Sequence, residues 1–519
     1  MSDTSPTTEA IVPRRAGWSG AAAAGLALGI TEFAAGLSPG IPSAISSIGA
    51  VIVDISPGWL ARTAISVLGT ADKGALAIGT VVVALVVGAV TGRATSRRPW
   101  VGPAVFAAFA LVGIAAQLAS GASAPAATIL ATASAAAVGA LALRLLLDAD
   151  RRSSASNPAA AVPGPDVIER RRFVGLLGTV AAGALVATIA GRQLIIRRSE
   201  AVRVSAVLPE PEIRVVPVSA EHAFDIPGLT PIVLGEPRFY RVDTALVVPV
   251  VDPETWTLKV TGMVDRELEL TYDDLLSMPQ VERYVTISCV SNPVGDTLVG
   301  NAKWQGVRLV DVLETAGVHP DASQIVGRSV DGWTAGFPTA AAFDGRDPLI
   351  VVGMNGEPLP RRHGFPARLI VPGLYGYVSA TKWLAEIELT TWDAFDGYWI
   401  PRGWAKQAPI KTQSRIDRPL FGGRVVGEVI AAGVAWAPTR GIAKVEVQLD
   451  DEPWQEAELS EPLSEDAWVQ WMLPIDASVG RHRLRVRATD GTGVTQTEER
   501  HDPRPDGATG WHTIEFTVA

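Results

Sequence analysis

The chain has 519 residues, too many for a single hydrophobic core, so two or three domains are expected. Hydrophobic residues make up 48% of it and charged residues 19%, a balance typical of a membrane part joined to a soluble part. The formal net charge is -9 and no arginine-rich patch is interleaved with aromatic residues, so a nucleic-acid partner is not expected.

Cysteine and histidine usage restricts the redox groups that the chain can carry. Cys289 is the only cysteine, which excludes an intrachain disulfide, an iron–sulfur cluster held by cysteines and a CxxCH haem attachment site. All six histidines lie beyond residue 200, so the apolar N-terminal part has no histidine pair for a haem. We therefore expect no haem and no iron–sulfur cluster, and electrons must pass to an external carrier.

The first 191 residues are predicted to form a membrane domain. Apolar segments of about 18 to 24 residues are long enough to cross a hydrocarbon core of about 30 Å. Five such segments occur, at 16–37, 74–91, 101–120, 124–147 and 173–191. A further segment, 41–69, contains Asp54, Pro57 and Arg62, which favours a re-entrant or interfacial piece but leaves a sixth crossing open.

Arginine clusters predict the orientation by the positive-inside rule. They lie at 14–15, 93–98 and 151–172, and five crossings put all three in the cytoplasm. The chain beyond residue 191 is then extracytoplasmic, at the plasma membrane, with the lipid bilayer as its first partner. Arg170 and Arg171 precede Phe173 as in a twin-arginine export signal, although a plain positive-inside anchor has the same pattern.

Residues 231–415 are predicted to form an α+β domain. Alternation at 256–260 indicates a strand, and Thr271 is a candidate helix cap. A second helix is predicted over 307–316, with Gly317 as its stop.

The remaining soluble segments differ in composition from this domain. Residues 192–230 are rich in proline and valine and are expected to be a tether. Residues 416–519 contain short alternating strands separated by turn residues, which predicts an immunoglobulin-like sandwich with a structural role.

Cys289 lies in TISCVSN, after an alternating pattern, and is therefore placed at or near a strand end. Alone, a cysteine is more often a small buried hydrophobe than a ligand. ISCVSN is followed by GNAKWQGVRLVDVL, NGEPLPRRHGFPARLIVPG and YGYVSATKWL, and these four motifs resemble the sulfite oxidase family in order and spacing. The resemblance begins near residue 238, and the strand-rich end resembles the family's dimerisation domain, which implies a homodimer.

The resemblance implies a molybdenum–molybdopterin cofactor, in which the metal is bound by a pterin dithiolene and one cysteine thiolate, here Cys289. His363, Arg368 and Lys382 fall at cofactor-binding positions of the family and suit a phosphate, whereas singly each is better explained as a surface ion-pair partner. Tyr240 and Arg241 fall where the methionine-sulfoxide reductase branch contacts the pterin. A protein that folds around its cofactor in the cytoplasm must be exported in the folded state, and this requirement favours the twin-arginine interpretation of Arg170 and Arg171.

The substrate pocket departs from the family pattern. An arginine expected five residues after the cysteine is replaced by Val294, a second by Asp243, and the expected tyrosine by Trp404. With Tyr375, these residues are candidates for the pocket wall. A dianion such as sulfite would meet a carboxylate and apolar surface, so a small neutral or cationic substrate, such as a sulfoxide, is expected.

Three alternatives remain open. The chain is a true sulfite oxidase if Arg402 or Arg415 supplies the absent guanidinium groups. It is a cofactor-free, membrane-anchored binding module if the fold has lost its chemistry. A transporter is suggested by the membrane part and by Glu32, but the spans are alanine-rich and show no internal repeat.

Overall fold

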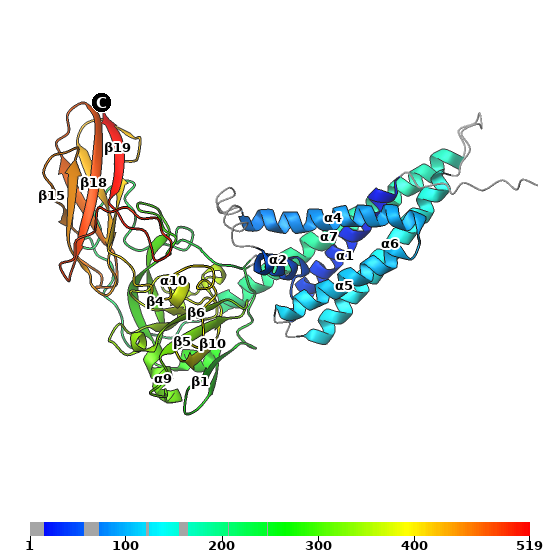
Figure 1. The fold of residues 1–519 in the computed structure, drawn as a ribbon, viewed down its shortest axis with the longest axis horizontal. Helices are drawn as coiled ribbons and strands as arrows, with labels where there is room; N and C mark the ends of the chain where they lie inside the picture. Colours follow the sequence, from blue (N-terminus) through cyan, green and yellow to red (C-terminus); the bar gives the residue numbers. More distant parts are fainter. Residues whose placement is uncertain (1–14, 57–71, 121–123, 155–164, 206, 246–247) are drawn as a thin grey trace, which may run out of the picture. The chain divides into compact units, whose positions relative to one another are not determined.

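The computed structural model describes residues 15–56, 72–120, 124–154, 165–205, 207–245 and 248–519 (Figure 1). The chain divides into two compact units. One comprises residues 1–200 with 245–250 and is helical, and the other comprises residues 201–244 with 251–519 and contains the strands.

The helices of the first unit, within the described residues, are α1 (Ala16–Leu37), α2 (Ala44–Ile55), α4 (Asp72–Arg97), α5 (Val101–Ala119), α6 (Pro125–Ser154) and α7 (Pro165–Ser205). All except α2 are long and apolar enough to cross a membrane, and they match the five predicted segments. With 12 residues, α2 is too short to cross. Some residues that bear on the topology lie outside the description: Arg14, Pro57, Arg62 and the side chain of Asp54.

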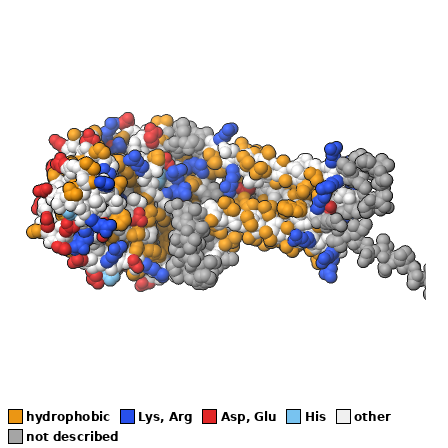
Figure 2. Space-filling view, turned by 90° about the horizontal axis from the view of Figure 1, so that it is seen from above, with side chains coloured by type: hydrophobic (Ala, Val, Ile, Leu, Met, Phe, Trp, Pro, Cys, Tyr) orange, Lys and Arg blue, Asp and Glu red, His pale blue; other side chains and the backbone are white. Residues whose placement is uncertain are grey.

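Several helix ends meet at one end of this unit. The backbone N–H of Arg15 donates to Asp150 (2.9 Å), and its guanidinium lies 5.3 Å from the centre of the Phe173 ring. Arg151 donates to the carbonyl of Ser96 (3.5 Å). The start of α1, the ends of α4 and α6 and the N-terminal half of α7 therefore carry their arginines to the same end, and Figure 2 shows the apolar surface of the helices beside these cations.

Close backbone contacts between helices depend on glycine in α1. A Cβ atom on Gly20 would lie 1.9 Å from the carbonyl oxygen of Gly88 in α4. One on Gly36 would lie 2.6 Å from the carbonyl oxygen of Gly191 in α7. Small residues at such crossings let apolar helices approach closely enough to pack without a hydrophobic driving force.

Glu32 of α1 has a structural role in this unit. Its buried carboxylate accepts hydrogen bonds from the Ser43 hydroxyl (2.8 Å) and the Ile45 backbone N–H (3.1 Å), at the start of α2. A carboxylate at this position satisfies N–H groups that have no partner within the helix. These contacts are those of a carboxylate that caps the start of α2.

Two sheets, one mixed and one antiparallel, form the first part of the second unit together with short helices, in agreement with the predicted α+β class. One has the order β2-β1-β10-β5-β6 and the other β3-β4-β7-β8, with β9 beside β7. The strands are β1 (Thr257–Gly262), β2 (Leu268–Thr271), β3 (Val281–Ser288), β4 (Val299–Arg308), β5 (Gln324–Ser329), β6 (Thr334–Pro338), β7 (Leu349–Met354), β8 (Glu357–Pro358), β9 (Arg368–Ile370) and β10 (Leu384–Thr390). They share one core, in which Trp304 is fully buried.

Short helices connect these strands: α8 (Tyr272–Ser277), α9 (Leu309–Ala316) and α10 (Gly376–Ser379). The Thr271 hydroxyl accepts from the Asp274 backbone N–H (3.1 Å), and the Asp274 carboxylate accepts from the Thr271 N–H (2.8 Å). This capping box fixes the predicted start of α8. Gly317 has φ of 72° after α9, a left-handed conformation that glycine adopts without strain, which confirms the predicted helix stop.

The C-terminal part consists of two sheets around a second core. Their orders are β11-β13-β17-β16 and β12-β19-β18-β14-β15, and Trp471 and Phe516 lie between them. The strands are β11 (Gln413–Arg418), β12 (Arg424–Val425), β13 (Val429–Trp436), β14 (Ile442–Leu449), β15 (Gln455–Glu456), β16 (Glu458–Leu459), β17 (Val469–Ile475), β18 (Gly480–Asp490) and β19 (His512–Val518). The immunoglobulin-like assignment stays a prediction.

The segment expected to be a tether, residues 192–230, is partly helical and partly hydrogen-bonded in its described residues. Helix α7 continues to Ser205, and the chain after it lies along the second unit. Gln305 donates to the carbonyl of Pro209 (2.7 Å), Glu212 donates to that of Gln280 (2.8 Å), and the Gln470 side chain donates to that of Thr230 (2.7 Å). Proline and valine favour extended backbone, and here its carbonyl and N–H groups find partners, so it packs instead of hanging free.

Candidate active site

Cys289 follows the last residue of β3, as predicted, and begins a loop closed by hydrogen bonds. Its backbone N–H donates to the carbonyl of Leu298 (2.9 Å), and the Leu298 N–H donates to the Asn292 side chain (2.8 Å). The Sγ atom lies 2.9 Å from the Ser291 hydroxyl and the residue is 8% exposed. Burial, partly offset by the contact with Ser291, raises the pKa of the Cys289 thiol, so the thiol is protonated at neutral pH and would have to lose that proton to ligate a metal.

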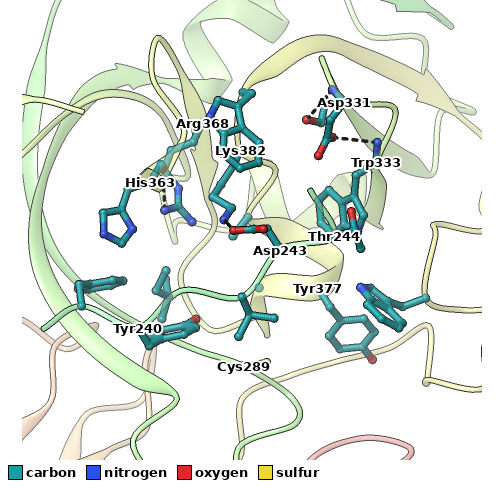
Figure 3. A pocket seen from close by; sticks show the side chains of 18 residues that line it. Tyr240, Asp243, Thr244, Cys289, Asp331, Trp333, His363, Arg368, Tyr377 and Lys382 are labelled. Carbon is teal, nitrogen blue, oxygen red and sulfur yellow. Dashed lines mark hydrogen bonds and ion pairs between the residues drawn. The ribbon is translucent and has the colours of Figure 1, made fainter. Parts of the chain in front are cut away.

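The Cys289 residue lines a pocket in the α+β part, shown in Figure 3. Segments far apart in the sequence meet there, from the stretch before β1 to the loop after β10. The other lining residues are Phe239, Tyr240, Val242, Asp243, Thr244, Ile287, Ser329, Asp331, Trp333, His363, Arg368, Gly376, Tyr377, Ala380, Lys382, Trp383 and Trp399.

Arg368 presents a buried guanidinium to this pocket from the start of β9. Its Nη1 donates to the carbonyl of His363 (3.1 Å), and its Cζ lies 5.1 Å from the centre of the Trp304 ring. The Nε atom is buried and has no hydrogen-bond partner within the described chain. Burial lowers the pKa of Arg368 to about 10, so it remains a cation at neutral pH with one N–H available to a bound group.

His363 lies beside Arg368 and is neutral. Burial, together with the charges of Arg368 and Lys382, lowers the pKa of His363 to about 3. Gly364, at φ of 114°, lets the backbone pass close to Lys382, since a Cβ atom there would lie 3.1 Å from the Lys382 Cα. The HGFPAR motif therefore brings a neutral imidazole and the Arg368 cation to the pocket beside Lys382.

Lys382 reaches across the pocket to a carboxylate. Its Nζ donates to Asp243 Oδ2 (2.7 Å), and it lies 4.7 Å from the centre of the Trp383 ring. The Arg241 Nε lies 3.6 Å from the same Asp243 oxygen. The charge of Lys382 is therefore compensated by Asp243, the residue that stands where the family pattern has an arginine.

The opposite side of the pocket is aromatic and carries one carboxylate. Asp331 and Trp333 lie in the turn between β5 and β6, where Asp331 Oδ1 accepts the Trp333 backbone N–H (3.1 Å). Tyr377 of α10 donates its hydroxyl to the carbonyl of Ala405, and its ring centre lies 5.9 Å from that of Trp404.

Most predicted site residues meet in this pocket: Tyr240, Asp243, Cys289, His363, Arg368 and Lys382. Of the other candidates, Arg241 contacts Asp243, Trp404 packs against the ring of Tyr377, and Val294 belongs to the loop after Cys289. The Tyr375 hydroxyl accepts from the Lys411 N–H (3.5 Å), and burial raises the pKa of Tyr375 to about 12. In the described structure the pocket lining does not include Arg241, Val294, Tyr375 or Trp404.

Sequence reasoning missed Asp331, Trp333, Tyr377 and Trp399. The Asp331-Gly332 pair signals a turn between strands, but no local pattern shows that this turn faces Cys289.

Comparisons with known proteins agree with this geometry. Residues 245–399 match the Oxidoreductase molybdopterin binding domain. Over 153 residues the chain is 37% identical to "Uncharacterized oxidoreductase YuiH" of Bacillus subtilis, a match that covers 30% of this chain and 74% of that protein. The chain belongs to the sulfite oxidase-like family of molybdopterin oxidoreductases.

Other members of the sulfite oxidase-like family match less completely. The chain is 30% identical to mitochondrial sulfite oxidase of Rattus norvegicus over 289 residues, which are 46% of this chain and 53% of that one. It therefore spans about half the length of that relative. The solved sulfane dehydrogenase SoxCD of Paracoccus pantotrophus aligns with a TM-score of 0.47 at 21% identity, covering 61% of this chain and 88% of its own, a level that decides nothing about chemistry.

The pocket has the groups that the family's molybdopterin needs. Cys289 offers one thiol, and the unpaired Arg368 Nε offers a buried charged donor to a phosphate. Among the residues with described positions, no group of three or more His, Cys, Asp or Glu side chains can hold a metal ion. A metal here would thus depend on sulfur ligands from the pterin besides Cys289.

The arginines considered for sulfite binding lie elsewhere in the structure. The guanidinium of Arg415 bonds the Asp417 carboxylate (2.7 Å), the Asp296 carbonyl (3.0 Å) and the Thr230 hydroxyl (2.8 Å). Arg402 lies over the ring of Tyr398. Neither is among the residues that line the described pocket.

Proposed function

We propose that this oxidoreductase is a membrane-anchored, extracytoplasmic molybdopterin enzyme that transfers an oxygen atom, in a two-electron reaction, to or from a small substrate other than sulfite. The observation that carries the proposal is the meeting of Cys289, Arg368 and Lys382 in one pocket. Its parts are a membrane domain (1–191), a molybdopterin domain (231–415) and an immunoglobulin-like sandwich (416–519).

In this proposal each pocket residue has one task. Cys289 ligates the metal, and Arg368 and Lys382 hold the anionic end of the pterin. His363 is neutral and contributes hydrogen bonds instead of charge, and Tyr240 closes the pterin side of the pocket. When bound, the cofactor supplies the two-electron chemistry, while these residues position it and limit the access of water.

The charges of the pocket disfavour sulfite as the substrate. In this proposal Arg368 and Lys382 are taken up by the anionic end of the pterin, and Lys382 also contacts the Asp243 carboxylate (2.7 Å), so neither cation is left for a second anion. No further arginine lines the described pocket. A dianion would lose its hydration without gaining a guanidinium partner, so a neutral or cationic oxygen-atom donor or acceptor fits better.

The placement outside the cytoplasm is supported by the five apolar helices and by the arginines that lie at one end of them, at the start of α1, the ends of α4 and α6 and the N-terminal half of α7; α7 also carries Arg192 and Arg197 towards its other end. Arg170 and Arg171, ahead of Phe173, act in this proposal as a twin-arginine export signal within the chain. An external carrier exchanges the electrons, and the sandwich joins two copies as a homodimer.

Turnover of the detergent-purified full chain tests the proposal. Sulfite oxidation is measured with ferricyanide, and sulfoxide reduction with a reduced viologen dye. The proposal expects turnover of an uncharged or cationic sulfoxide or amine oxide in a screen, and little with sulfite. Fast sulfite oxidation would contradict it and support the sulfite oxidase alternative.

A further inference from the structure

The side of the pocket away from Arg368 is built from one carboxylate and three aromatic rings. Figure 3 shows Asp331, Trp333 and Tyr377 on one side and His363 and Arg368 on the other. The third ring, that of Trp399, also lines the pocket. We call Asp331, Trp333, Tyr377 and Trp399 the Asp331 wall.

Asp331 differs from the other pocket carboxylate in its partners. Asp243 is bonded to Lys382 at 2.7 Å, whereas among the described residues the carboxylate of Asp331 accepts one hydrogen bond, from the Trp333 backbone N–H to Oδ1 at 3.1 Å. Throughout the described ranges no Lys, Arg or His forms an ion pair with Asp331. Its negative charge is therefore available to a molecule in the pocket.

The distribution of charge leaves a negative and aromatic surface for the substrate. Under the proposed function, on which this inference rests, Arg368 and Lys382 are occupied by the pterin phosphate. A substrate near Cys289 then faces the Asp331 wall without a compensating cation. Aromatic faces attract cations through their quadrupoles, and a carboxylate adds an opposite charge.

We propose that the Asp331 wall binds a positively charged head group of the substrate, a quaternary ammonium or a protonated amine, and so determines which oxygen-atom donors or acceptors the enzyme takes. Asp331 is a specificity residue in this arrangement, and it takes no part in the redox step. Trp333 and Trp399 supply the ring faces, and Tyr377 is held in place through its hydrogen bond to Ala405. An anionic substrate is repelled by the same carboxylate.

The test uses two probes of the same shape that differ in charge. Choline carries a quaternary ammonium, and 3,3-dimethylbutan-1-ol replaces its nitrogen by carbon. Both are titrated by calorimetry into the detergent-purified, molybdenum-loaded full chain. We expect choline to bind about tenfold more tightly than the alcohol, as a partly desolvated cation–π and carboxylate contact requires.

Two variants show whether the preference for choline depends on the charge of Asp331 or follows from the loss of any carboxylate. Asp331→Asn keeps the side-chain oxygen that accepts the Trp333 N–H but removes the charge, and should abolish most of the preference for choline while leaving the alcohol unchanged. Asp252→Asn is the matched control, because Asp252 makes the same bond to a backbone N–H two residues later (3.1 Å) and does not line the pocket as described. This control should keep the preference.

The outcomes distinguish this inference from the proposed function. Equal binding of choline and the alcohol by molybdenum-loaded protein would overturn the Asp331 wall alone, as would an unchanged preference in Asp331→Asn. If Asp331→Asn does not fold, the comparison of the two probes on the native chain still decides. Absence of molybdenum from the native chain would instead overturn the proposed function.

Discussion

The Nζ atom of Lys382 lies 2.7 Å from Oδ2 of Asp243, and the two side chains are only 10% and 4% exposed. The pair joins the loop after α10 to the segment before β1, and both residues line the Cys289 pocket. In a buried pair, removal of one partner leaves the other charge uncompensated, at a cost of about 3–5 kcal/mol. A bound pterin phosphate would neutralise Lys382 in place of Asp243, so loss of Asp243 should be tolerated better than loss of Lys382.

Substitution of the two partners is expected to have unequal effects on cofactor content. Asp243→Asn leaves an ammonium that a phosphate can neutralise, so this variant should retain pterin. Lys382→Met removes the cation and leaves a carboxylate that repels the phosphate, so it should lose most of its pterin. Pterin released by oxidation is measured by fluorescence.

A lysine–aspartate pair outside the pocket serves as the control. Lys406 donates to Asp396 (2.8 Å), and Lys406→Met should keep its pterin. Equal loss of pterin from Asp243→Asn and Lys382→Met would indicate a purely structural ion pair and contradict the assignment of Lys382 to the cofactor.

Arg415 is expected to act on stability instead of on sulfite. Its side chain is 6% exposed and that of Asp417 is 9% exposed, so Arg415→Met leaves a buried carboxylate and should destabilise the chain by about 3–5 kcal/mol. Arg402→Met, at an exposed position, loses the contact with the Tyr398 ring and should destabilise the chain by about 0.5–1 kcal/mol. Thermal unfolding compares the two. Sulfite turnover that disappears in Arg415→Met at unchanged stability would restore the sulfite oxidase alternative.

Local features of the fold could be predicted from the sequence, because their signals lie within a few residues. The capping box at Thr271, the stop at Gly317 and the strand end before Cys289 are of this kind. The partners of Arg415 could not be predicted, since Thr230 lies 185 residues earlier in the chain. The contribution of the Asp331 turn to the pocket could not be predicted either, because the local sequence indicates a turn but not which part of the fold the turn faces.

Glycine at the α1–α4 crossing should resist substitution. In Gly20→Ala the new Cβ would lie 1.9 Å from the Gly88 carbonyl oxygen, so the helices must separate and the thermal midpoint in detergent should fall. Gly79→Ala is the control, because nothing lies within 4 Å of its Cβ position. Alanine is favoured over glycine in a helix interior by about 0.5–1 kcal/mol, so the control should be neutral or slightly stabilising. Equal midpoints for both variants would contradict this helix packing.

His512 is expected to make stability depend on pH. Burial, then the charge of Arg415, lowers the pKa of His512 from 6.5 to about 4, and its Nδ1 accepts the Ile416 N–H (2.9 Å). A lowered histidine pKa means that the unfolded chain binds the proton more tightly. The contribution is therefore complete above about pH 6.5 and is lost as the pH falls towards 4, by at most about 1.4 kcal/mol per pH unit.

The comparison that isolates His512 is the difference between the native chain and His512→Asn. The Asp466 carboxyl, whose pKa is raised to about 6 by burial, contributes with the opposite sign but equally in both proteins. Thermal midpoints measured between pH 7.5 and 4.5 should fall more steeply for the native chain. Parallel profiles would show that His512 is not buried as a neutral acceptor.

Molybdenum content, with and without the Cys289 thiol, tests the proposed enzyme most directly. The full chain is purified in detergent from cells with an intact pterin pathway, beside Cys289→Ser, and each is analysed for metal and by circular dichroism. We expect near-stoichiometric molybdenum in the native chain, and loss of metal or altered metal spectra in a variant that remains folded. A native chain without molybdenum would contradict the proposal and favour a cofactor-free binding module.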